Sequence, residues 1–426
     1  MNKAIAGAYT AAKVPILIVG GGLGSFTAAL SLHRAGIQNK MIVPTQRFTE
    51  KARAGVFLGG SAVRILDRLG LGSQYRALGT PMYTIRVENI KGNRIADFHL
   101  DEIGTEVWTL PREYLQQLFL ESIPSGSVSF RTKFRSLQIQ TAGVKVKVLD
   151  INKESKTSKE GQQAFIDTRF VVGADGMNSA VRMCMSRPVM TVPSGIISWQ
   201  AVVRNRSLDD IPLHIGKEIW DKNLRFGFAR MTPTEVVWWA IVSNSSNVLL
   251  RPFAPRLLHF FKGFPSIVTD LISSVDSDRD ISRAEMKRVW PEEFPWVDNN
   301  SSRIALVGDA GRPRNTGNFH MSTTLAIEDS YILANHLADQ NEKGMLTVGP
   351  NLERYALNRS ERKAVIDQFA KLCNLLSSSD SSIRRYLTKK LLRLSVHRLA
   401  FGGMSLNMPN DESFQRELSV ETFPHR

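Results

Sequence analysis

The chain has 426 residues, of which 42% are hydrophobic and 22% are charged, an ordinary composition for a globular protein. This length predicts two joined domains or one large α/β body with insertions. The formal net charge is +15, but the basic residues are spread along the chain and form no tract of five or six. We therefore expect no nucleic-acid partner as the main function, although a dinucleotide remains a suitable polyanion.

The sequence predicts an intracellular, cytoplasmic protein. No apolar run approaches the roughly 18 residues that span a bilayer, and the first thirteen residues do not resemble a signal peptide, although a short organellar leader is not excluded. Cys184 and Cys373 stand outside any CxxC spacing and are expected to be reduced thiols, with no metal site. The oligomeric state is left open.

The chain opens with the pattern of a βαβ unit. Residues 15–19 form a continuous apolar run, residues 20–25 a glycine-rich turn, residues 26–34 a helix and residues 40–43 a second strand. Gly20 permits a tight turn, and Gly22 lets the backbone approach a pyrophosphate at the helix N-terminus. The third position of GxGxxG falls on Ser25, beside Gly24, and serine is still small enough for close packing. A structural turn without a ligand is the alternative.

The second strand departs from ordinary adenosine binding. An acidic residue is expected about 20 residues after the glycines, where it binds the ribose hydroxyls. Here the strand runs into Pro44, and no Asp or Glu occurs before Glu50. Thr45 or Gln46 could contact the ribose instead, or Arg47 could pair with a phosphate.

Two later segments repeat one pattern, a buried strand that ends in a Gly/Asp cluster. Residues 172–182 read VGADGMNSAVR, and residues 304–313 read IALVGDAGRP. Aspartates at the mouths of parallel strands suit ribose or ribityl hydroxyls, whereas helix N-caps are the alternative. The candidate positions in these segments are Asp175, Gly176, Arg182, Gly308, Asp309 and Ala310.

Long strands in the middle of the chain predict an inserted antiparallel sheet. They cover residues 196–203, 224–230 and 235–242, and helices return at residues 257–273 and 322–337. Because alternate residues of a strand face opposite sides, only about half of the aromatic candidates for a substrate pocket can line it, and ordinary sheet packing is an equal alternative for each. These candidates are Trp199, Phe226, Phe228, Trp238 and Trp239.

Three motifs in this order resemble a known family. GxGxxG near residue 20, GADGxxSxxR at residues 173–182 and GDAxxP at residues 308–313 are similar to those of the flavoprotein monooxygenases. That family includes p-hydroxybenzoate, salicylate and urate hydroxylases and zeaxanthin epoxidase. Shorter similarities surround Arg53 and Arg112, and the resemblance covers residues 14–340.

The resemblance implies an α/β fold of the GR2 type. A Rossmann-like FAD-binding domain would comprise residues 1–190 and 300–345, with strands at about residues 81–104 joining the substrate sheet. An antiparallel substrate domain would follow at residues 191–299, and a helical region at residues 346–426.

The resemblance also implies FAD as cofactor and NAD(P)H as reductant. Asp309 would hold the ribityl chain, Arg112 would serve the pyrophosphate side with the glycine turn, and Asp175 and Arg182 would support both FAD and the nicotinamide nucleotide. O2 would form a flavin C4a-hydroperoxide that oxygenates a small aromatic or conjugated substrate. No protein acid or base is assigned.

The departures from the family cluster near the expected flavin ring. Arg312 replaces a histidine, and two loop glycines fall on His320 and Ser322. His320 could contact flavin or substrate, but a plain loop residue is the favoured interpretation. A divergent relative without turnover, and an FAD oxidoreductase without oxygen insertion, are therefore the alternatives.

A basic amphipathic segment covers residues 383–401. It could lie on an anionic membrane surface, but a terminal helix packed on the body with its arginines outward is favoured.

Overall fold

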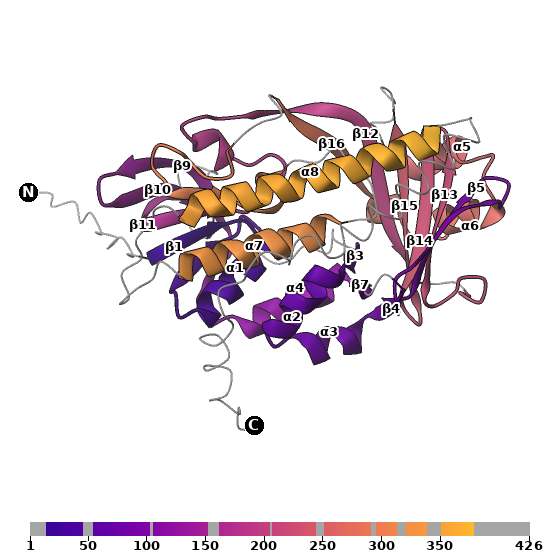
Figure 1. Ribbon diagram of the computed structural model, residues 1–426, viewed down its shortest axis with the longest axis horizontal. Coiled ribbons are helices and arrows are strands. Elements are labelled where there is room, and N and C mark those ends of the chain that lie inside the picture. Colours follow the sequence, from indigo (N-terminus) through magenta and orange to yellow (C-terminus); the bar gives the residue numbers. More distant parts are fainter. Residues whose placement is uncertain are drawn as a thin grey trace, which may run out of the picture.

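The computed structural model describes residues 14–45, 54–102, 105–151, 162–204, 207–243, 251–290, 295–312, 321–338 and 351–378. Expectations for Gln46, Arg47, Arg53, His320 and residues 383–401 therefore lie outside the described residues, as does the side chain of Cys373. Two large sheets stand at the two ends of an elongated body, and one long helix runs along both (Figure 1). Within the described ranges, no helix combines the length and apolar character needed to cross a membrane.

The first sheet is the parallel core that the βαβ pattern predicts. β1 (Val14–Val19) pairs in parallel with β2 (Asn39–Ile42) and with β11 (Gln162–Gly173), and β11 pairs in parallel with β17 (Ile304–Leu306). β8 (Val128–Ser129), β10 (Gly143–Asp150) and β9 (Thr132–Gln140) complete the order β8-β2-β1-β11-β10-β9. Ile16, Leu17 and Ile18 are fully buried, as expected for a strand covered on both faces.

Most strands of the second sheet, β12 to β16, lie between β11 and β17 in the chain, and β5 and β6 join them from an earlier segment. The order of this sheet is β16-β12-β15-β14-β13-β5-β6, and every pair is antiparallel except β13 with β5. The α/β fold with an inserted, mainly antiparallel sheet is thus confirmed, and residues 84–99 join that sheet. The strands are β5 (Thr84–Asn89), β6 (Arg94–His99), β12 (Met190–Val203), β13 (Ile215–Asp221), β14 (Leu224–Thr232), β15 (Glu235–Ser243) and β16 (Ser282–Trp290).

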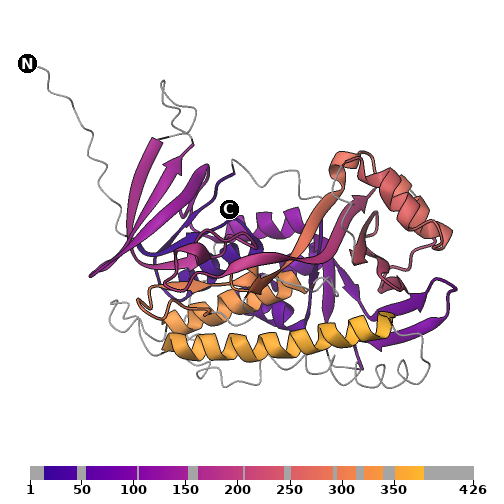
Figure 2. The same cartoon turned by 90° about the horizontal axis from the view of Figure 1, so that it is seen from above.

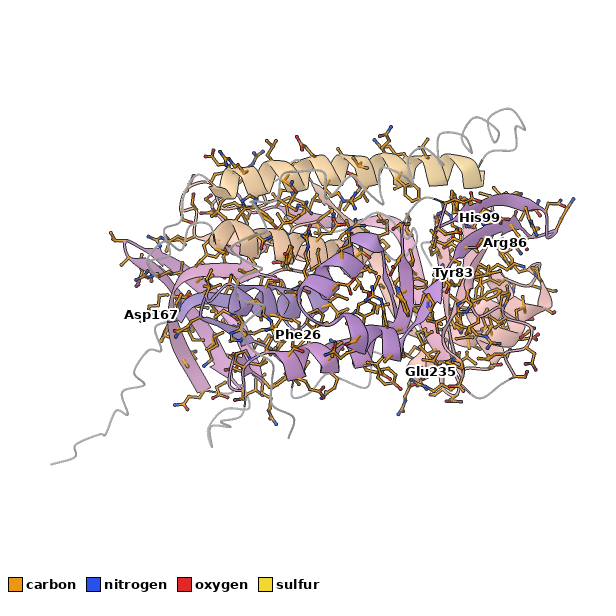
Figure 3. The ribbon with its side chains drawn as sticks, turned by 60° about the horizontal axis from the view of Figure 1, so that its bottom comes forward. Phe26, Tyr83, Arg86, His99, Asp167 and Glu235 are labelled. Atoms are coloured by element: carbon orange, nitrogen blue, oxygen red, sulfur yellow. The ribbon has the colours of Figure 1, made fainter. Side chains whose placement is uncertain are left out.

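Short elements connect the two sheets. A three-stranded sheet of β3 (Gly55–Leu58), β7 (Val107–Pro111) and β4 (Thr80–Met82) lies between them, beside α2 (Gly60–Arg68), α3 (Gly72–Leu78) and α4 (Arg112–Ser122). In Figure 3, Phe26 of α1 (Leu23–Arg34) lies near the first sheet. Tyr83, Arg86 and His99 lie around β5 and β6, at the opposite end of the molecule. α5 (Phe253–Phe260) and α6 (Ser266–Ser273) cover the outer face of the second sheet.

The long helix α8 (Asn351–Ser378) packs on α7 (Ser322–Ala338) and extends along the molecule in both views (Figure 2). Buried ion pairs join the two helices. Arg362 contacts both carboxylate oxygens of Glu328, at 2.8 and 3.0 Å, and Arg359 Nη1 lies 3.1 Å from Asp329 Oδ1. Ser61 of α2 also donates to Glu328. The cluster therefore ties α2, α7 and α8 together.

Glu328 remains ionised inside this cluster. Burial alone would raise the pKa of Glu328, but the charge and hydrogen bonds of Arg362, with Arg359 and Ser61, outweigh burial and hold it at about 2. Since its ordinary pKa is 4.5, the unfolded chain takes up a proton before the folded chain does on acidification. The stability from this group is therefore present above pH 4.5 and is lost as the pH falls toward 2.

Glu328→Gln tests the cluster. We expect it to lower the free energy of unfolding by about 3–5 kcal/mol at neutral pH, because breaking a buried pair leaves a charge uncompensated. In urea unfolding at a series of pH values, the gap between wild type and variant should narrow from about pH 5 downward. Glu361→Gln, at an exposed site on α8, is the control, and an equal loss in both variants would contradict the assignment.

Candidate functional site

The glycine turn is pressed against the second motif. Gly20 has a φ of +140°, and a Cβ there would lie 2.2 Å from the carbonyl oxygen of Ala174. Ser25 donates to the same oxygen at 3.4 Å, so serine at the third motif position still serves close packing. Only glycine fits position 20, because any side chain would strain the backbone and meet a carbonyl.

Arg112 lies between the glycine turn and the third motif. Its Nη2 is 3.9 Å from the position of a Cβ on Gly22, at the N-cap of α1. Burial lowers the pKa of Arg112, and the negative charge of Asp309 raises it. Asp309 belongs to the single 3₁₀ turn Gly308–Ala310 after β17. The fold thus brings together three sequence-predicted residues from separate segments.

Asp175 accepts backbone hydrogen bonds through one carboxylate oxygen and leaves the other without a partner among the described residues. Its Oδ2 accepts from the backbone N–H groups of Ala180 at 2.7 Å and Val181 at 3.2 Å. Its Oδ1 is buried and has no hydrogen-bond partner among the described residues. Burial raises the pKa of Asp175, against the opposing hydrogen bonds of Ser179 and the backbone. A buried oxygen without a partner fits a ligand hydroxyl.

Arg182 joins the second motif to the third. Its side chain is 2% exposed, and it donates to the carbonyl oxygens of Ala310 at 2.8 Å, Met177 at 2.8 Å and Val189 at 3.2 Å. Each guanidinium nitrogen thus has one backbone carbonyl as acceptor, so Arg182 supports the site by joining the turns of the two motifs.

Two other predicted glycines are packing sites. A Cβ on Gly24 would lie 3.3 Å from Ala326 Cβ, and one on Gly308 would lie 3.0 Å from the same atom. Gly308 has a φ of +59°, and its N–H donates to Asp329 Oδ2 at 2.9 Å. These positions let α7 approach the first and third motifs. By contrast, Gly176 has a φ of +80° and open space around its Cα.

A cavity of about 820 Å³, open solvent at its mouth included, adjoins the glycine turn. We call it the glycine-turn cavity. Residues 20–22 and 174–176 line it, together with Thr132 and Lys133 of β9. Sequence reasoning missed these two, because no motif marks them. They reach the cavity through backbone hydrogen bonds from Arg131 N to Thr45 O at 3.0 Å and from Thr132 N to Val43 O at 2.9 Å.

A second cavity of about 920 Å³, again including open solvent, lies between the second sheet and the starts of α2 and α7. We call it the apolar cavity. Gly59, Gly60 and Ser61 line one side, and Met321 and Thr324 lie beside the segment where the flavin ring is expected. Most of its lining is apolar: Phe57, Met82, Phe98, Leu100, Trp239 and Phe369.

Only one of the five aromatic candidates lines the apolar cavity. Trp239 faces it. The other four lie in the core on the opposite face of the sheet, packed with Phe261 and Leu257 beneath α5 and α6, which corrects their proposed role. The alternation of side chains along a strand separates Trp238 from Trp239. The four are Trp199, Phe226, Phe228 and Trp238.

Glu218 is a buried carboxyl group that sequence reasoning missed. It lines the apolar cavity and accepts from Trp220 Nε1 at 2.6 Å and from Trp239 Nε1 at 2.8 Å. Burial raises the pKa of Glu218, against the charge of Arg225 and the two indole hydrogen bonds. The only sequence signal is that Gly216, Glu218 and Trp220 share one face of β13. Without the fold, this pattern does not show that the face borders a cavity.

Arg312, which stands where the family usually has histidine, belongs to the ionic cluster. It is 2% exposed, its Nη2 lies 3.6 Å from Asp329 Oδ2, and its guanidinium lies 5.9 Å from the ring centre of Trp296. Ser322 begins α7. Across the described ranges, no group of three or more His, Cys, Asp or Glu residues could hold a metal ion.

Arg182→Lys separates the support that Arg182 gives to the backbone from a direct contact with a nicotinamide nucleotide. Lysine keeps the charge but replaces only one of three hydrogen bonds, so we expect the free energy of unfolding to fall by about 3 kcal/mol. Urea unfolding measures this, with the exposed Arg187→Lys as control. Unchanged stability together with weaker binding of a nicotinamide nucleotide would instead indicate that Arg182 contacts the nucleotide directly.

Comparisons with known proteins agree with this geometry. The profile of the family described as "FAD binding domain" matches residues 13–340. Aurachin C monooxygenase/isomerase of Stigmatella aurantiaca is 26% identical over 82% of this chain and 85% of its own length. The 2-heptyl-3-hydroxy-4(1H)-quinolone synthase of Pseudomonas aeruginosa is 24% identical over 89% and 94%.

Solved structures show the same fold. Klebsiella pneumoniae HpxO, complexed with FAD and uric acid, superposes with a TM-score of 0.74 at 19% identity, over 92% of this chain and 95% of that one. Since the family profile also covers most of the sequence, the chain belongs to the FAD-binding-domain family of flavoprotein monooxygenases.

Proposed function

We propose that the chain is an FAD-dependent, NAD(P)H-driven monooxygenase that inserts one oxygen atom from O2 into a small aromatic or conjugated molecule. The carrying observation is that Arg112 lies next to Gly22, which lines the glycine-turn cavity, and interacts electrostatically with Asp309. The names of the relatives, which include monooxygenases of aurachin C and of hydroxybenzoate derivatives, support the reaction type. No observation favours the alternatives without turnover or without oxygen insertion.

The residues beside the glycine-turn cavity fit FAD. Gly20 and Gly22 would let the pyrophosphate approach the N-terminus of α1, where N–H groups and the helix dipole favour an anion. Arg112 would add a positive charge there, and Asp309 would accept from ribityl hydroxyls. The spare Oδ1 of Asp175 would accept from another hydroxyl, and Lys133 of the lining adds a cation where the family acid is missing.

The apolar cavity would hold the substrate. When bound, FAD supplies the reduction by NAD(P)H and the activation of O2. The protein's part is to place a flat ring against Phe57, Trp239 and Phe369 and to exclude water from the reacting atoms. We also propose the division into an FAD-binding domain at residues 1–190 and 300–345, a substrate domain at residues 191–299 and a helical region at residues 346–426. An intracellular location rests on the two cysteines.

Asp309→Ala tests the cofactor assignment. We expect the wild type to release free FAD on denaturation, detectable by chromatography. The variant should lose FAD at least about tenfold more readily, because hydrogen bonds to a charged acceptor contribute about 1.5–3 kcal/mol. Asp175→Ala should weaken FAD less. Dissociation constants from fluorescence titration check the order, and equal, negligible effects in both variants would contradict it.

Labelled O2 tests the reaction. With NAD(P)H and a panel of small aromatics, we expect a product that carries one labelled oxygen atom, measured by mass spectrometry. Omission of the aromatic should leave only H2O2, because activated oxygen without an acceptor is released. Consumption of NAD(P)H that yields H2O2 alone with every aromatic would instead identify an FAD oxidoreductase without oxygen insertion.

A further inference from the structure

The apolar cavity has few polar side chains, and two of them are already engaged. Ser61 donates to Glu328. Thr324 accepts from Gly59 N at 2.9 Å and donates to the carbonyl oxygen of Phe57 at 3.2 Å. This leaves Glu218 and the hydroxyl group of Thr105, which has no hydrogen-bond partner among the described residues. Among the described side chains, recognition of a polar group inside this cavity therefore falls to these two residues.

A glycine on β14, the strand between β13 and β15, makes room for a side chain that fixes Glu218. Glu218 pairs with Gly227 of β14, and Gly227 pairs with Trp239 of β15. A Cβ on Gly227 would lie 2.3 Å from the indole ring of Trp239. Because position 227 is glycine, this indole crosses β14 and donates to Glu218 Oε1. Trp220 donates to Oε2, so the carboxyl group is held from two sides.

The fixed carboxyl group still has capacity to accept. Its two oxygens offer about four lone-pair directions, and the indoles occupy one on each oxygen. Burial raises the pKa of Glu218, and the positive charge of Arg225, whose guanidinium lies 4.5 Å from the ring centre of Trp220, opposes this rise. None of the described residues that line the cavity is Lys, Arg or His. An anionic substrate would therefore find a buried carboxyl group and no cation among the described residues of the lining.

We infer that Glu218 is the specificity-determining residue of the apolar cavity: it accepts a hydrogen bond from a ring N–H or hydroxyl group of a neutral aromatic substrate and disfavours carboxylates. The inference rests on the proposed function and names its substrate class. Glu218 supplies the acceptor that the two buried indole N–H groups require, and it also lines the open cavity. Its remaining lone pairs are therefore available to a donor group of a ligand in the cavity.

Three naphthalene probes separate the contributions. 2-Naphthol carries one O–H donor, 2-methoxynaphthalene has none, and 2-naphthoate is an anion of similar size. Each is titrated calorimetrically into the FAD-loaded protein without NAD(P)H, at mildly alkaline pH where the carboxylate is favoured. We expect 2-naphthol to bind at least about tenfold more tightly than either other probe. This comparison needs no variant and no turnover.

Substitutions assign the preference to its residue. Glu218→Leu should bring 2-naphthol and 2-methoxynaphthalene to within about twofold of each other, and Glu218→Gln, which keeps a neutral acceptor, should give an intermediate preference. Thr105→Val removes the other polar group and should keep most of the preference. Glu88→Gln removes a carboxylate that is paired with Lys217 at 2.7 Å and does not line the cavity, so it should keep all of it.

Two results would overturn the inference. One is equal binding of the three probes, or tightest binding of 2-naphthoate, by the wild type. The other is a preference for 2-naphthol that survives in Glu218→Gln and disappears in Thr105→Val. Failure of the proposed function is a separate result, since absence of bound FAD or of labelled product is measured independently of probe affinity.

Discussion

The close contact between the glycine turn and the second motif is the constraint on which the site depends. Gly20 comes so near the carbonyl oxygen of Ala174 that no Cβ fits, and Ala174 N donates back to Val19 O at 2.8 Å. Val307 N in turn donates to Gly173 O at 3.0 Å. The ends of β1, β11 and β17 therefore meet at one edge, where α/β sheets bind their ligands.

Arg182 stabilises this meeting point with side-chain hydrogen bonds. It donates to a carbonyl oxygen of the second motif and to one of the third motif. These hydrogen bonds fix the two turns relative to each other. A guanidinium suits this task because its donors are fixed in one plane. An arginine of the second motif thus acts on the glycine-turn region through the backbone.

The helices α7 and α8 connect the ionic cluster to the apolar cavity. Glu328 and Asp329 anchor α8 through Arg359 and Arg362, and two turns further along α8 Phe369 lines the apolar cavity. At the other end, Met321 and Thr324 of the α7 region border the same cavity. Loss of the ionic cluster would therefore change the shape of the apolar cavity as well as the stability of the fold.

The sequence by itself determined the local elements and the order of the motifs. The apolar run before Gly20, the two Gly/Asp clusters and the long central strands follow from short-range patterns, and the parallel sheet with an inserted, mainly antiparallel sheet agrees with them. The Gly/Asp cluster singled out Asp309 and the family resemblance singled out Arg112, and the fold brings their charges together. Alternation also indicated that only part of the aromatic set could face a pocket, without showing which part.

Tertiary structure decided what each side chain contacts. Lys133 reaches the glycine-turn cavity because β9 begins beside residues 43–45, a pairing that no local pattern encodes. Glu218 becomes a fixed acceptor only because Gly227 lets an indole from the next strand cross to it. Burial and partners come from residues distant in sequence, so the same Glu or Arg reads as an ordinary surface charge until the chain is folded around it.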